Sequence, residues 1–348
     1  MLSLISQIFL VVILGLLIAL FGAPLAIWLA KKIGAIDVPN SASHKRHLTP
    51  MPLAGGFIAI GGSWLLFMFF SLWGKTSLRA VLVSGVVIFI FGLLDDIYGL
   101  SAPQKVFGQI IASILLGYLG VSVLFLDTVN LGFSSFWIRI LNQALSLIWL
   151  VGITNAFNLI DSMDGLVAGL TFIIASFFSF ITLVAGQTYL ALFSSMLVGL
   201  SFGLYWHNKQ PARFFLGDSG AQFLGFCLAA IAILYRPPDL NPNSTWFIPI
   251  LLLGVPIFDT TLVTISRLRR GKPVFQADRS HTYHRLVDFG LSPNLAVIVI
   301  QASALVLSSA AFLIMYLSPA WALSLFLVIL LVGAAMIVFF EKTFYHTA

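Results

Sequence analysis

The 348-residue chain is much more apolar than a soluble protein, since 60% of its residues are hydrophobic and only 9% are charged. A soluble domain carries roughly 25% charged residues, so a chain of this composition cannot cover itself with a water-facing surface. The formal net charge of +6 would suit a nucleic-acid ligand, but the distribution of the charges favours a membrane protein, and we expect no nucleic-acid partner.

Apolar blocks that are long enough to cross a bilayer recur along the whole chain. A hydrocarbon core about 30 Å thick requires about 20 apolar residues in a helix. The blocks are approximately Ile5–Ala30, Leu53–Trp73, Leu78–Leu94, Val106–Leu126, Phe136–Ile153, Leu166–Ala185, Tyr189–Trp206, Ala221–Tyr235, Trp246–Ile265, Leu295–Leu317 and Ala320–Phe340. We therefore expect an all-α polytopic membrane protein with about eleven transmembrane helices, forming a single domain over residues 1–348.

Two features near or inside these blocks have simple interpretations. The first block is longer than the apolar region of a signal peptide and lacks a basic segment before it, so we expect a retained span. The single cysteine, Cys227, lies inside an apolar run. Such a residue usually behaves as a small buried hydrophobe, so we expect neither a disulfide nor thiolate chemistry.

The basic residues are distributed unevenly between the two ends of the predicted spans. If the N-terminus is outside, all but four of the 18 Lys and Arg residues fall on the cytoplasmic side, the exceptions being Lys75, Arg79, Arg139 and Arg236. The positive-inside rule then places the N-terminus outside and the C-terminus in the cytoplasm, with residues 266–293 as the longest cytoplasmic loop.

The acidic residues gather on the same face, although the positive-inside rule does not apply to them. Of the 12 Asp and Glu residues, only Asp127 and Asp239 lie on the outer side. A transporter or channel would more naturally carry charges in the middle of its helices, facing an internal path. The pattern therefore favours chemistry at the cytoplasmic surface of the membrane.

The first polar cluster is the pair Asp95 and Asp96, which closes the third predicted span. An ordinary polar helix end is the alternative interpretation. However, the C-terminus of a helix carries partial negative charge and disfavours carboxylates, and two adjacent carboxylates repel each other. A neighbouring cation or a metal bound with a phosphate would compensate for this arrangement, so we regard both residues as functional candidates.

The second cluster is a series of amide and carboxylate side chains at every third position between the fifth and sixth spans, namely Asn155, Asn158, Asp161 and Asp164. Successive members of such a series can converge on one ligand from a helical or 3₁₀ turn. Oxygen-rich ligands of this kind suit Mg²⁺ or Mn²⁺. Asp164 alone would most simply be the N-cap of the sixth span.

The third cluster precedes the eighth span and contains Arg213, Phe215, Gly217 and Asp218. Glycines and a carboxylate at the start of a helix are typical of a site where the backbone approaches a phosphate, with a metal reducing the charge. The alternative is that Asp218 is simply an N-cap.

The fourth cluster is the long basic loop, whose first half, Arg267–Lys272, is explained by membrane topology. Its second half contains Arg279, His281 and His284, which can present several hydrogen-bond donors to phosphates. A structural zinc site is the alternative for the two histidines, but no third histidine or thiolate lies nearby in the sequence.

In this order and at these positions, the four clusters resemble the polyprenyl-phosphate N-acetylhexosamine-1-phosphate transferases (glycosyltransferase family 4). The resemblance extends from Asp37-Val-Pro-Asn and Pro50-Met-Pro-Leu-Ala-Gly-Gly in the first loop to His284. The string Asp278-Arg-Ser-His-Thr-Tyr-His is similar to that of the enzymes that initiate O-antigen and teichoic-acid synthesis (the WecA and TagO branch). The peptidoglycan enzyme MraY instead carries three consecutive histidines. Departures from the family pattern are Tyr283 for histidine, Ser162-Met163 between the aspartates and Leu53 for arginine.

The resemblance implies transfer of a sugar 1-phosphate, GlcNAc-1-phosphate above all, from a UDP-sugar to undecaprenyl phosphate with release of UMP, as the first membrane step of a cell-envelope polysaccharide. It implies Mg²⁺, with Mn²⁺ as a substitute, held by Asp218 and Asn158. Asp95 and Asp96 would be catalytic, together with His281 and His284. The substrate-binding residues implied are Asn155, Asp161, Asp164, Phe215 and Arg279. The location implied is the bacterial cytoplasmic (inner) membrane, and a homodimer is a further expectation.

Three alternatives remain open from the sequence. A transporter of an anionic metabolite or lipid-linked sugar would give flux across a membrane without UMP formation. A non-catalytic scaffold would tolerate loss of the carboxylates. Within the family, the chain could be a phospho-MurNAc-pentapeptide transferase, and the sequence does not say which UDP-sugar is used.

Overall fold

The computed structural model describes residues 3–39, 49–128, 132–237, 246–273 and 280–344. The chain divides into two compact units, Met1–Pro238 and Asp239–Ala348, and each is described by itself. The expected single domain over residues 1–348 stays a prediction.

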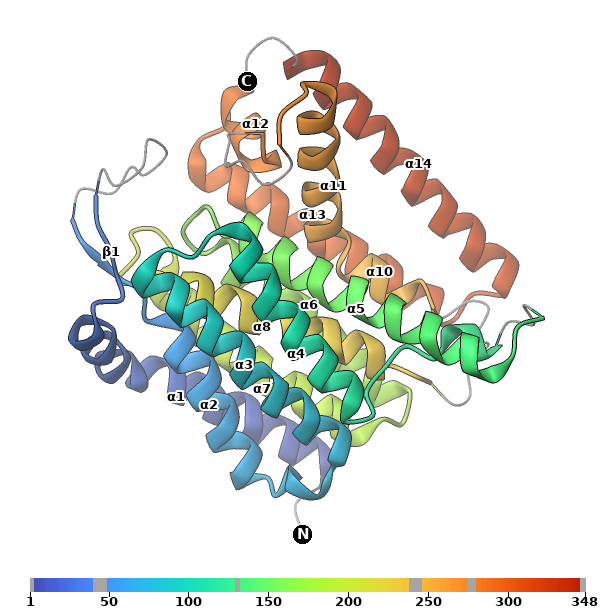
Figure 1. The fold of residues 1–348 in the computed structure, drawn as a ribbon, viewed down its shortest axis with the longest axis horizontal. Coiled ribbons are helices and arrows are strands. Elements are labelled where there is room, and N and C mark those ends of the chain that lie inside the picture. Colours follow the sequence, from blue (N-terminus) through green and yellow to red (C-terminus); the bar gives the residue numbers. More distant parts are fainter. Residues whose placement is uncertain (1–2, 40–48, 129–131, 238–245, 274–279, 345–348) are drawn as a thin grey trace. The chain divides into compact units, whose positions relative to one another are not determined.

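Long helices make up nearly all of the first unit (Figure 1). They are α1 (Leu4–Ile33), α2 (Gly55–Phe69), α3 (Thr76–Tyr98), α4 (Ala102–Tyr118), α5 (Ser135–Ile160), α6 (Leu166–Val184), α7 (Thr188–Asn208) and α8 (Gly217–Leu234). Two 3₁₀ turns, η1 (Leu72–Gly74) and η2 (Phe125–Thr128), lie in the connections. Helix α8 packs against α2, α3, α5, α6 and α7, and every residue from Ser219 to Ile233 is buried, so α8 is the central helix of this unit.

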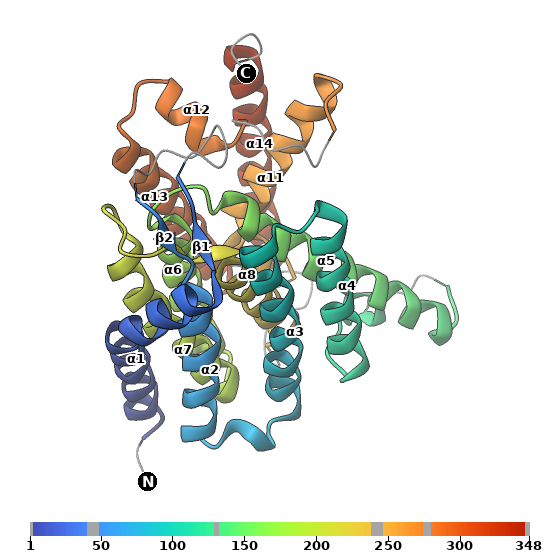
Figure 2. The ribbon, with the colours of Figure 1, turned by 60° about the vertical axis from the view of Figure 1, so that its left-hand side comes forward.

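A small antiparallel pair of strands is the departure from the predicted all-α fold within the described residues. Strand β1 (Ile36–Asp37) pairs with β2 (Met51–Pro52), with Ile36 opposite Pro52, and Figure 2 shows the two strands beside each other. Directly after β2, Leu53 forms a parallel bridge with Phe215. The first loop of the chain is thereby joined to the segment that leads into α8.

The second unit contains α10 (Ile248–Leu252), α11 (Gly254–Arg269), α12 (Thr282–Asp288), α13 (Pro293–Ile314) and α14 (Pro319–Phe344). The predicted span Trp246–Ile265 was wrong as one continuous helix, because Leu253 ends α10 and begins α11. Pro256 lies in the first turn of α11, where its missing N–H leaves no helical hydrogen bond unmade. Proline therefore favours a new helix start at this point.

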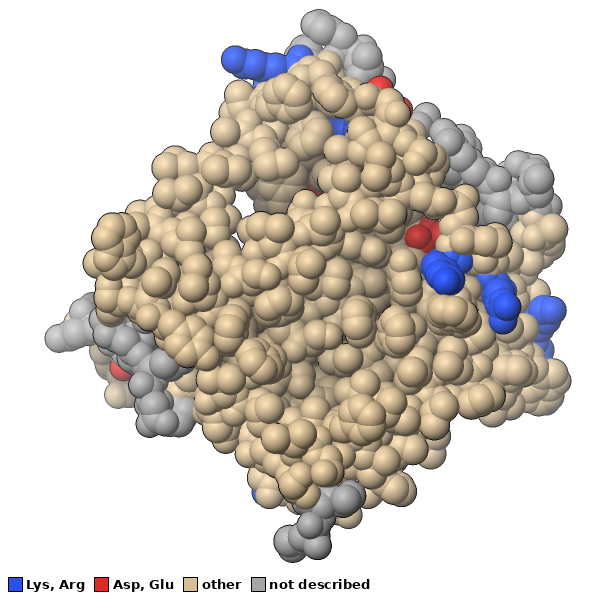
Figure 3. All heavy atoms as spheres, turned by 180° about the vertical axis from the view of Figure 1, so that it is seen from behind, with Lys and Arg blue, Asp and Glu red and all other residues tan. Residues whose placement is uncertain are grey.

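Eight of the described helices are long and apolar enough to cross a membrane, namely α1, α3, α5, α6, α7, α8, α13 and α14. The other predicted spans correspond to α2, which has 15 residues, to α4, which has 17, and to the divided pair α10 and α11. On the face in Figure 3, most of the described atoms belong to residues other than Lys, Arg, Asp and Glu. These features confirm a helical, polytopic membrane protein, while the number of eleven spans stays a prediction.

Candidate active site

The carboxylate of Asp96, in the last turn of α3, caps the beginning of α8. Its Oδ1 accepts a hydrogen bond from the Asp218 N–H at 2.7 Å. Its Oδ2 accepts from the Ser219 N–H at 3.2 Å and from the Ser219 hydroxyl at 2.6 Å. The first N–H groups of a helix have no partner within the helix and attract negative charge, so Asp96 stabilises α8 from a different helix.

Two glycines allow the end of α3 to approach the beginning of α8 this closely. A Cβ atom on Gly92 would lie 2.5 Å from the Cα of Ser219. Gly217 has a φ of 72°, and a Cβ there would lie 2.6 Å from the Asp96 carboxylate. Larger residues at either position would separate Asp96 from the N–H groups that it caps.

The side chain of Lys105, in the first turns of α4, bridges the other carboxylate of the pair to α8. Its Nζ lies 2.5 Å from Asp95 Oδ2 and 2.6 Å from Asp218 Oδ2. The Lys105 side chain is 25% exposed, the Asp95 side chain 8% and the Asp218 side chain 27%. From the sequence, Lys105 was counted only as one of many cytoplasmic basic residues. Its position just after the turn that follows Asp95 and Asp96 could have indicated that its side chain faces them.

Amide side chains surround the same oxygen of Asp218. Asn158 Nδ2 donates to Asp218 Oδ2 at 3.1 Å, and Gln222 Nε2 donates to it at 3.5 Å. Gln222 in turn accepts from Gln109 Nε2 at 3.0 Å, and both glutamines are buried. Asn158 and Asp218, the two residues expected to hold Mg²⁺, therefore contact each other directly, while their role as metal ligands stays a prediction. The two glutamines were missed because each lies inside an apolar run.

The series Asn155 to Asp164 is divided between a helix and a turn. Asn155 and Asn158 lie near the end of α5, which stops at Ile160, and Asp161 is its C-cap. Asp161 is placed among like charges: burial, and then the charges of Asp218, Asp96 and Asp164, raise the pKa of its carboxyl well above the usual range. The second cluster therefore lies close to the first and third clusters, as one ligand site would require.

Asp164 does not act as the N-cap of α6, which was the simplest expectation for it. The N-cap is Gly165, which has a φ of 74°. Asp164 Oδ2 instead accepts a hydrogen bond from the Ala212 N–H at 3.3 Å. The Asp164 carboxylate thus ties the turn before α6 to the loop before α8.

The loop before α8 is fixed by its backbone. The Phe215 N–H donates to Pro52 O at 3.0 Å, and Phe215 O accepts from the Ala54 N–H at 3.1 Å. The ring of Phe215 is partly exposed, whereas the neighbouring Phe214 is buried. Asp218 lies in the first turn of α8, whose N-cap is Leu216, so the N-cap alternative for Asp218 was wrong.

The chemistry of these groups fits a divalent metal ion. When all groups are ionised, the net formal charge of the cluster is −2. Three negative charges come from the carboxylates of Asp95, Asp96 and Asp218, and one positive charge comes from the ammonium group of Lys105. Carboxylate and amide oxygens are the donors that Mg²⁺ and Mn²⁺ accept. A half-turn of the Asn158 amide group about its last side-chain bond would direct its oxygen, in place of its nitrogen, at a cation. Within the described ranges, no three or more His, Cys, Asp and Glu side chains form a ready-made metal site.

The histidines of the fourth cluster lie in the second unit. His281 is the N-cap of α12, and its Nδ1 lies 2.7 Å from Asp259 Oδ2 on α11. His284 lies one turn later on α12 and is partly exposed, while Tyr283 is buried. Arg279, which was predicted to bind substrate, lies outside the described residues.

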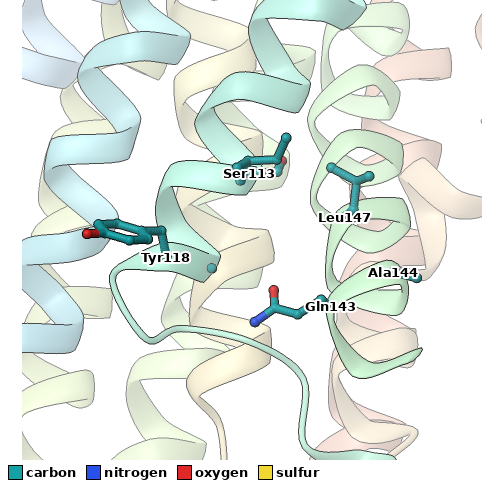
Figure 4. Close-up of a pocket in the computed structure, with 7 residues that line it drawn as sticks. Ser113, Tyr118, Gln143, Ala144 and Leu147 are labelled. Atoms are coloured by element: carbon teal, nitrogen blue, oxygen red, sulfur yellow. The ribbon is translucent and has the colours of Figure 1, made fainter. Parts of the chain in front are cut away.

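A pocket of about 410 Å³ lies between α4 and α5 in the first unit, lined by Ser113, Ile114, Gly117, Tyr118, Gln143, Ala144 and Leu147. Figure 4 shows the Gln143 side chain reaching from α5 toward α4. At a rise of about 1.5 Å per residue, Ser113 is roughly 12 Å along α4 from Lys105. The pocket therefore does not include the carboxylates.

Comparison with known proteins gives a consistent result. Residues 78–236 match the sequence model of glycosyl transferase family 4. The chain is 35% identical to the "probable undecaprenyl-phosphate N-acetylglucosaminyl 1-phosphate transferase" of Bacillus subtilis, over 92% of this chain and 88% of the relative. It is 33% identical to the decaprenyl-phosphate N-acetylglucosaminephosphotransferase of Mycobacterium tuberculosis, over 78% and 74% of the two chains. It is 28% identical to the undecaprenyl-phosphate alpha-N-acetylglucosaminyl 1-phosphate transferase of Escherichia coli, over 84% and 80%.

Proposed function

The chain belongs to glycosyl transferase family 4, and we propose that it transfers N-acetylglucosamine 1-phosphate from UDP-N-acetylglucosamine to undecaprenyl phosphate. The named activities of its relatives support this substrate pair. The observation that carries the proposal is the carboxylate cluster where the ends of two apolar helices meet: Lys105 bridges Asp95 and Asp218, and Asp96 caps the beginning of α8. An oxygen of the acceptor phosphate attacks the phosphorus that bears the sugar. The bond from that phosphorus to the oxygen of the UMP portion breaks, and UMP leaves with that oxygen.

The reaction brings several anions together, so charge neutralisation and alignment are the main tasks of the site. Asp218 and Asn158 would hold Mg²⁺, for which Mn²⁺ would substitute, and the metal would reduce the negative charge of the diphosphate. Asp95 would orient the acceptor phosphate or receive its proton. A phosphate monoester has a second pKa near 6, so little basicity is required.

The structure leads us to divide the Asp95 and Asp96 pair into two roles. Both oxygens of Asp96 accept hydrogen bonds from the beginning of α8. We assign Asp96 to holding the Asp218 turn in place and leave the direct role to Asp95. Of the other expected residues, Asn155, Asp161, Asp164 and Phe215 would bind the nucleotide, and Arg279, His281 and His284 would contact the diphosphate or the sugar.

The proposed location is the cytoplasmic (inner) membrane of a bacterium, with eleven spans, the N-terminus outside and the C-terminus in the cytoplasm. A nucleotide sugar is a soluble cytoplasmic substrate, and the phosphate of a polyprenyl lipid lies at the headgroup level. In the proposed topology the carboxylates lie at the cytoplasmic end of α3, where the two substrates can meet. The homodimer stays an expectation.

The test is UMP release by purified protein supplied with undecaprenyl phosphate, UDP-N-acetylglucosamine and Mg²⁺. The variants are Asp95→Asn, Asp218→Asn and His281→Ala, with Lys75→Met as a matched control far from the carboxylates on α3. We expect the three variants to lose at least about a hundredfold in turnover, as is usual when a charged catalytic group is removed. Turnover close to that of the unchanged protein in all three would refute the assignment.

A second experiment identifies the donor. The same assay is run with UDP-N-acetylgalactosamine and with UDP-MurNAc-pentapeptide. Release of UMP only from the latter would make the chain a phospho-MurNAc-pentapeptide transferase. Flux of a lipid-linked sugar into proteoliposomes without any UMP release would support the transporter alternative.

A further inference from the structure

The ring of His281 is held by a buried carboxylate that the sequence did not single out. Asp259 lies on α11 with 1% of its surface exposed, and its Oδ2 is 2.7 Å from His281 Nδ1. Its other oxygen, Oδ1, accepts the Thr282 N–H at 2.7 Å. An ionised carboxylate only accepts hydrogen bonds, so Nδ1 of His281 carries the proton. In the neutral ring the second nitrogen, Nε2, then carries a lone pair and accepts a hydrogen bond.

The backbone that leads into His281 is held from the other side by an ion pair. Arg285 Nε donates to the Ser280 carbonyl oxygen at 2.8 Å. Arg285 Nη2 lies 2.9 Å from Glu341 Oε1. Both members of the pair are buried, with 2% of Arg285 and 1% of Glu341 exposed. Charged side chains are almost never buried to this extent unless they are paired, so the pair fixes the position of Arg285.

Glu341 belongs to the end of the last helix, and this end differs from the rest of α14. Most of α14 is exposed in the structure, but Phe340, Glu341 and Phe344 are buried. Phe340 and Phe344 form an apolar cluster with Leu262 of α11, against which Leu286 of α12 also packs. The end of α14 is thus attached to the two helices that carry Asp259 and His281.

We propose that Asp259 and Glu341 are positioning residues for His281, Asp259 acting on the imidazole ring and Glu341 acting through Arg285 on the backbone at Ser280. The proposal rests on the proposed function, in which His281 contacts the diphosphate or the sugar. A histidine whose ring and backbone are both held presents Nε2 in one direction without an ordering cost when the substrate binds. Nε2 accepts from a sugar hydroxyl in the neutral ring, and it donates to the diphosphate when it also carries a proton. Fixing the tautomer of a functional histidine through its other ring nitrogen is a common use of a buried carboxylate.

The first test is a double-mutant cycle measured as kcat and KM for UMP release. The variants are Asp259→Asn, Glu341→Gln, His281→Gln and the two double variants that include His281→Gln. We expect Asp259→Asn to lower kcat about 10- to 100-fold, the range found when the partner of a functional histidine is removed, and Glu341→Gln to lower it about tenfold. In the His281→Gln background each should lower kcat less than about twofold, because both act through His281. Asp288→Asn, an exposed carboxylate on α12, is the matched control.

The cycle separates failure of the inference from failure of the proposed function. Absence of UMP release by the unchanged protein would overturn the proposed function and the inference with it. If that protein is active, losses that multiply fully in the double variants would overturn the inference alone, because a general loss of stability acts with or without His281.

The second test does not depend on activity. In protein labelled with ¹⁵N at its six histidines, the His281 signals are assigned by their absence from the His281→Gln spectrum. We expect a protonated Nδ1 in the unchanged protein, and we expect loss of that fixed tautomer in Asp259→Asn. The same ¹⁵N pattern in both proteins would overturn the role of Asp259.

Discussion

Lys105 provides the most informative perturbation of the site, because its ammonium group stands between two carboxylates that we propose to lie near the metal ion. Its Nζ is 2.5 Å from Asp95 and 2.6 Å from Asp218. A dication that enters between the two carboxylates has to displace this ammonium group. We therefore predict that Lys105→Met binds Mn²⁺ more tightly than the unchanged protein does, although it has lost a side chain from the site.

The size of the effect follows from the repulsion between the metal and the displaced ammonium group. A dication between the two carboxylates that now bind Lys105 would drive the ammonium group out to about 10 Å, where the repulsion at an effective dielectric constant near 20 is still about 3 kcal/mol, and Lys105→Met lacks this repulsion. Solvent reaches a quarter of the Lys105 and Asp218 side chains, so screening reduces this by about half. A remaining difference of about 1.4 kcal/mol corresponds to a tenfold lower dissociation constant for the metal.

The assay is a Mn²⁺ titration followed by electron paramagnetic resonance, with no substrate present. Lys105→Arg keeps the charge and should bind Mn²⁺ about as the unchanged protein does. Lys75→Met removes the same charge at the opposite end of α3, about 30 Å from Asp95 at a rise of about 1.5 Å per residue, and should leave Mn²⁺ binding unchanged. Equal or weaker binding by Lys105→Met would refute the reasoning, because it would mean that the ammonium group does not compete with the metal.

Three further changes test the surroundings of this cluster. Asp96→Asn should lower the free energy of unfolding by about 1–2 kcal/mol, since it weakens a charged cap of α8, and thermal melting in detergent beside Asp288→Asn measures the loss. Asp161→Asn should stabilise the metal-free protein increasingly as the pH rises. The pKa of the Asp161 carboxyl is raised in the folded state, so the folded protein still binds a proton at a pH where the unfolded protein has lost it. The free energy of unfolding of the unchanged protein therefore falls as the pH rises, until the pH passes the folded pKa, and the variant lacks this loss. A melting temperature of Asp161→Asn that follows the unchanged protein at every pH would contradict this. Gly92→Ala should melt at a lower temperature and bind Mn²⁺ more weakly. Its Cβ would lie 2.5 Å from the Cα of Ser219, so the end of α3 would have to move away from the beginning of α8. Unchanged Mn²⁺ binding would show that the site tolerates this separation.

The sequence predicted well those features that depend on local pattern. Apolar blocks separated by polar segments predicted the helical membrane fold, and the adjacent Asp95 and Asp96 predicted a helix end with a compensating partner nearby. Lys105, at the beginning of the next helix, could have been identified as that partner from its position. Its second contact could not, because Lys105 and Asp218 are 113 positions apart and meet only when α4 packs near α8. Asp259 and Glu341 were missed because neither belongs to one of the four polar clusters. Asp259 lies inside the predicted span Trp246–Ile265, and Glu341 directly follows the last span, where a lone carboxylate resembles an ordinary boundary residue.

The errors in the predicted helices also have a physical cause. Hydropathy measures whether a segment can be buried in lipid, and it does not measure whether the backbone continues as one helix. Trp246–Ile265 is mainly apolar, yet a proline in the first turn of α11 accompanies a new helix start at Gly254. In the same way, the apolar segment after Tyr118 was counted as part of a span, although α4 ends there.

Two helix ends of opposite polarity account for the choice of carboxylates at this site. The C-terminus of α3 disfavours Asp95 and Asp96, while the N-terminus of α8 favours negative charge. Asp96 resolves the conflict because its carboxylate accepts hydrogen bonds from the beginning of α8, which leaves the charges of Asp95 and Asp218 to be compensated by the single ammonium group of Lys105. Because that compensation is incomplete, the excess negative charge would favour a further cation at this point. In the proposed reaction Asp218 and Asn158 would hold that cation, which would reduce the negative charge of the diphosphate.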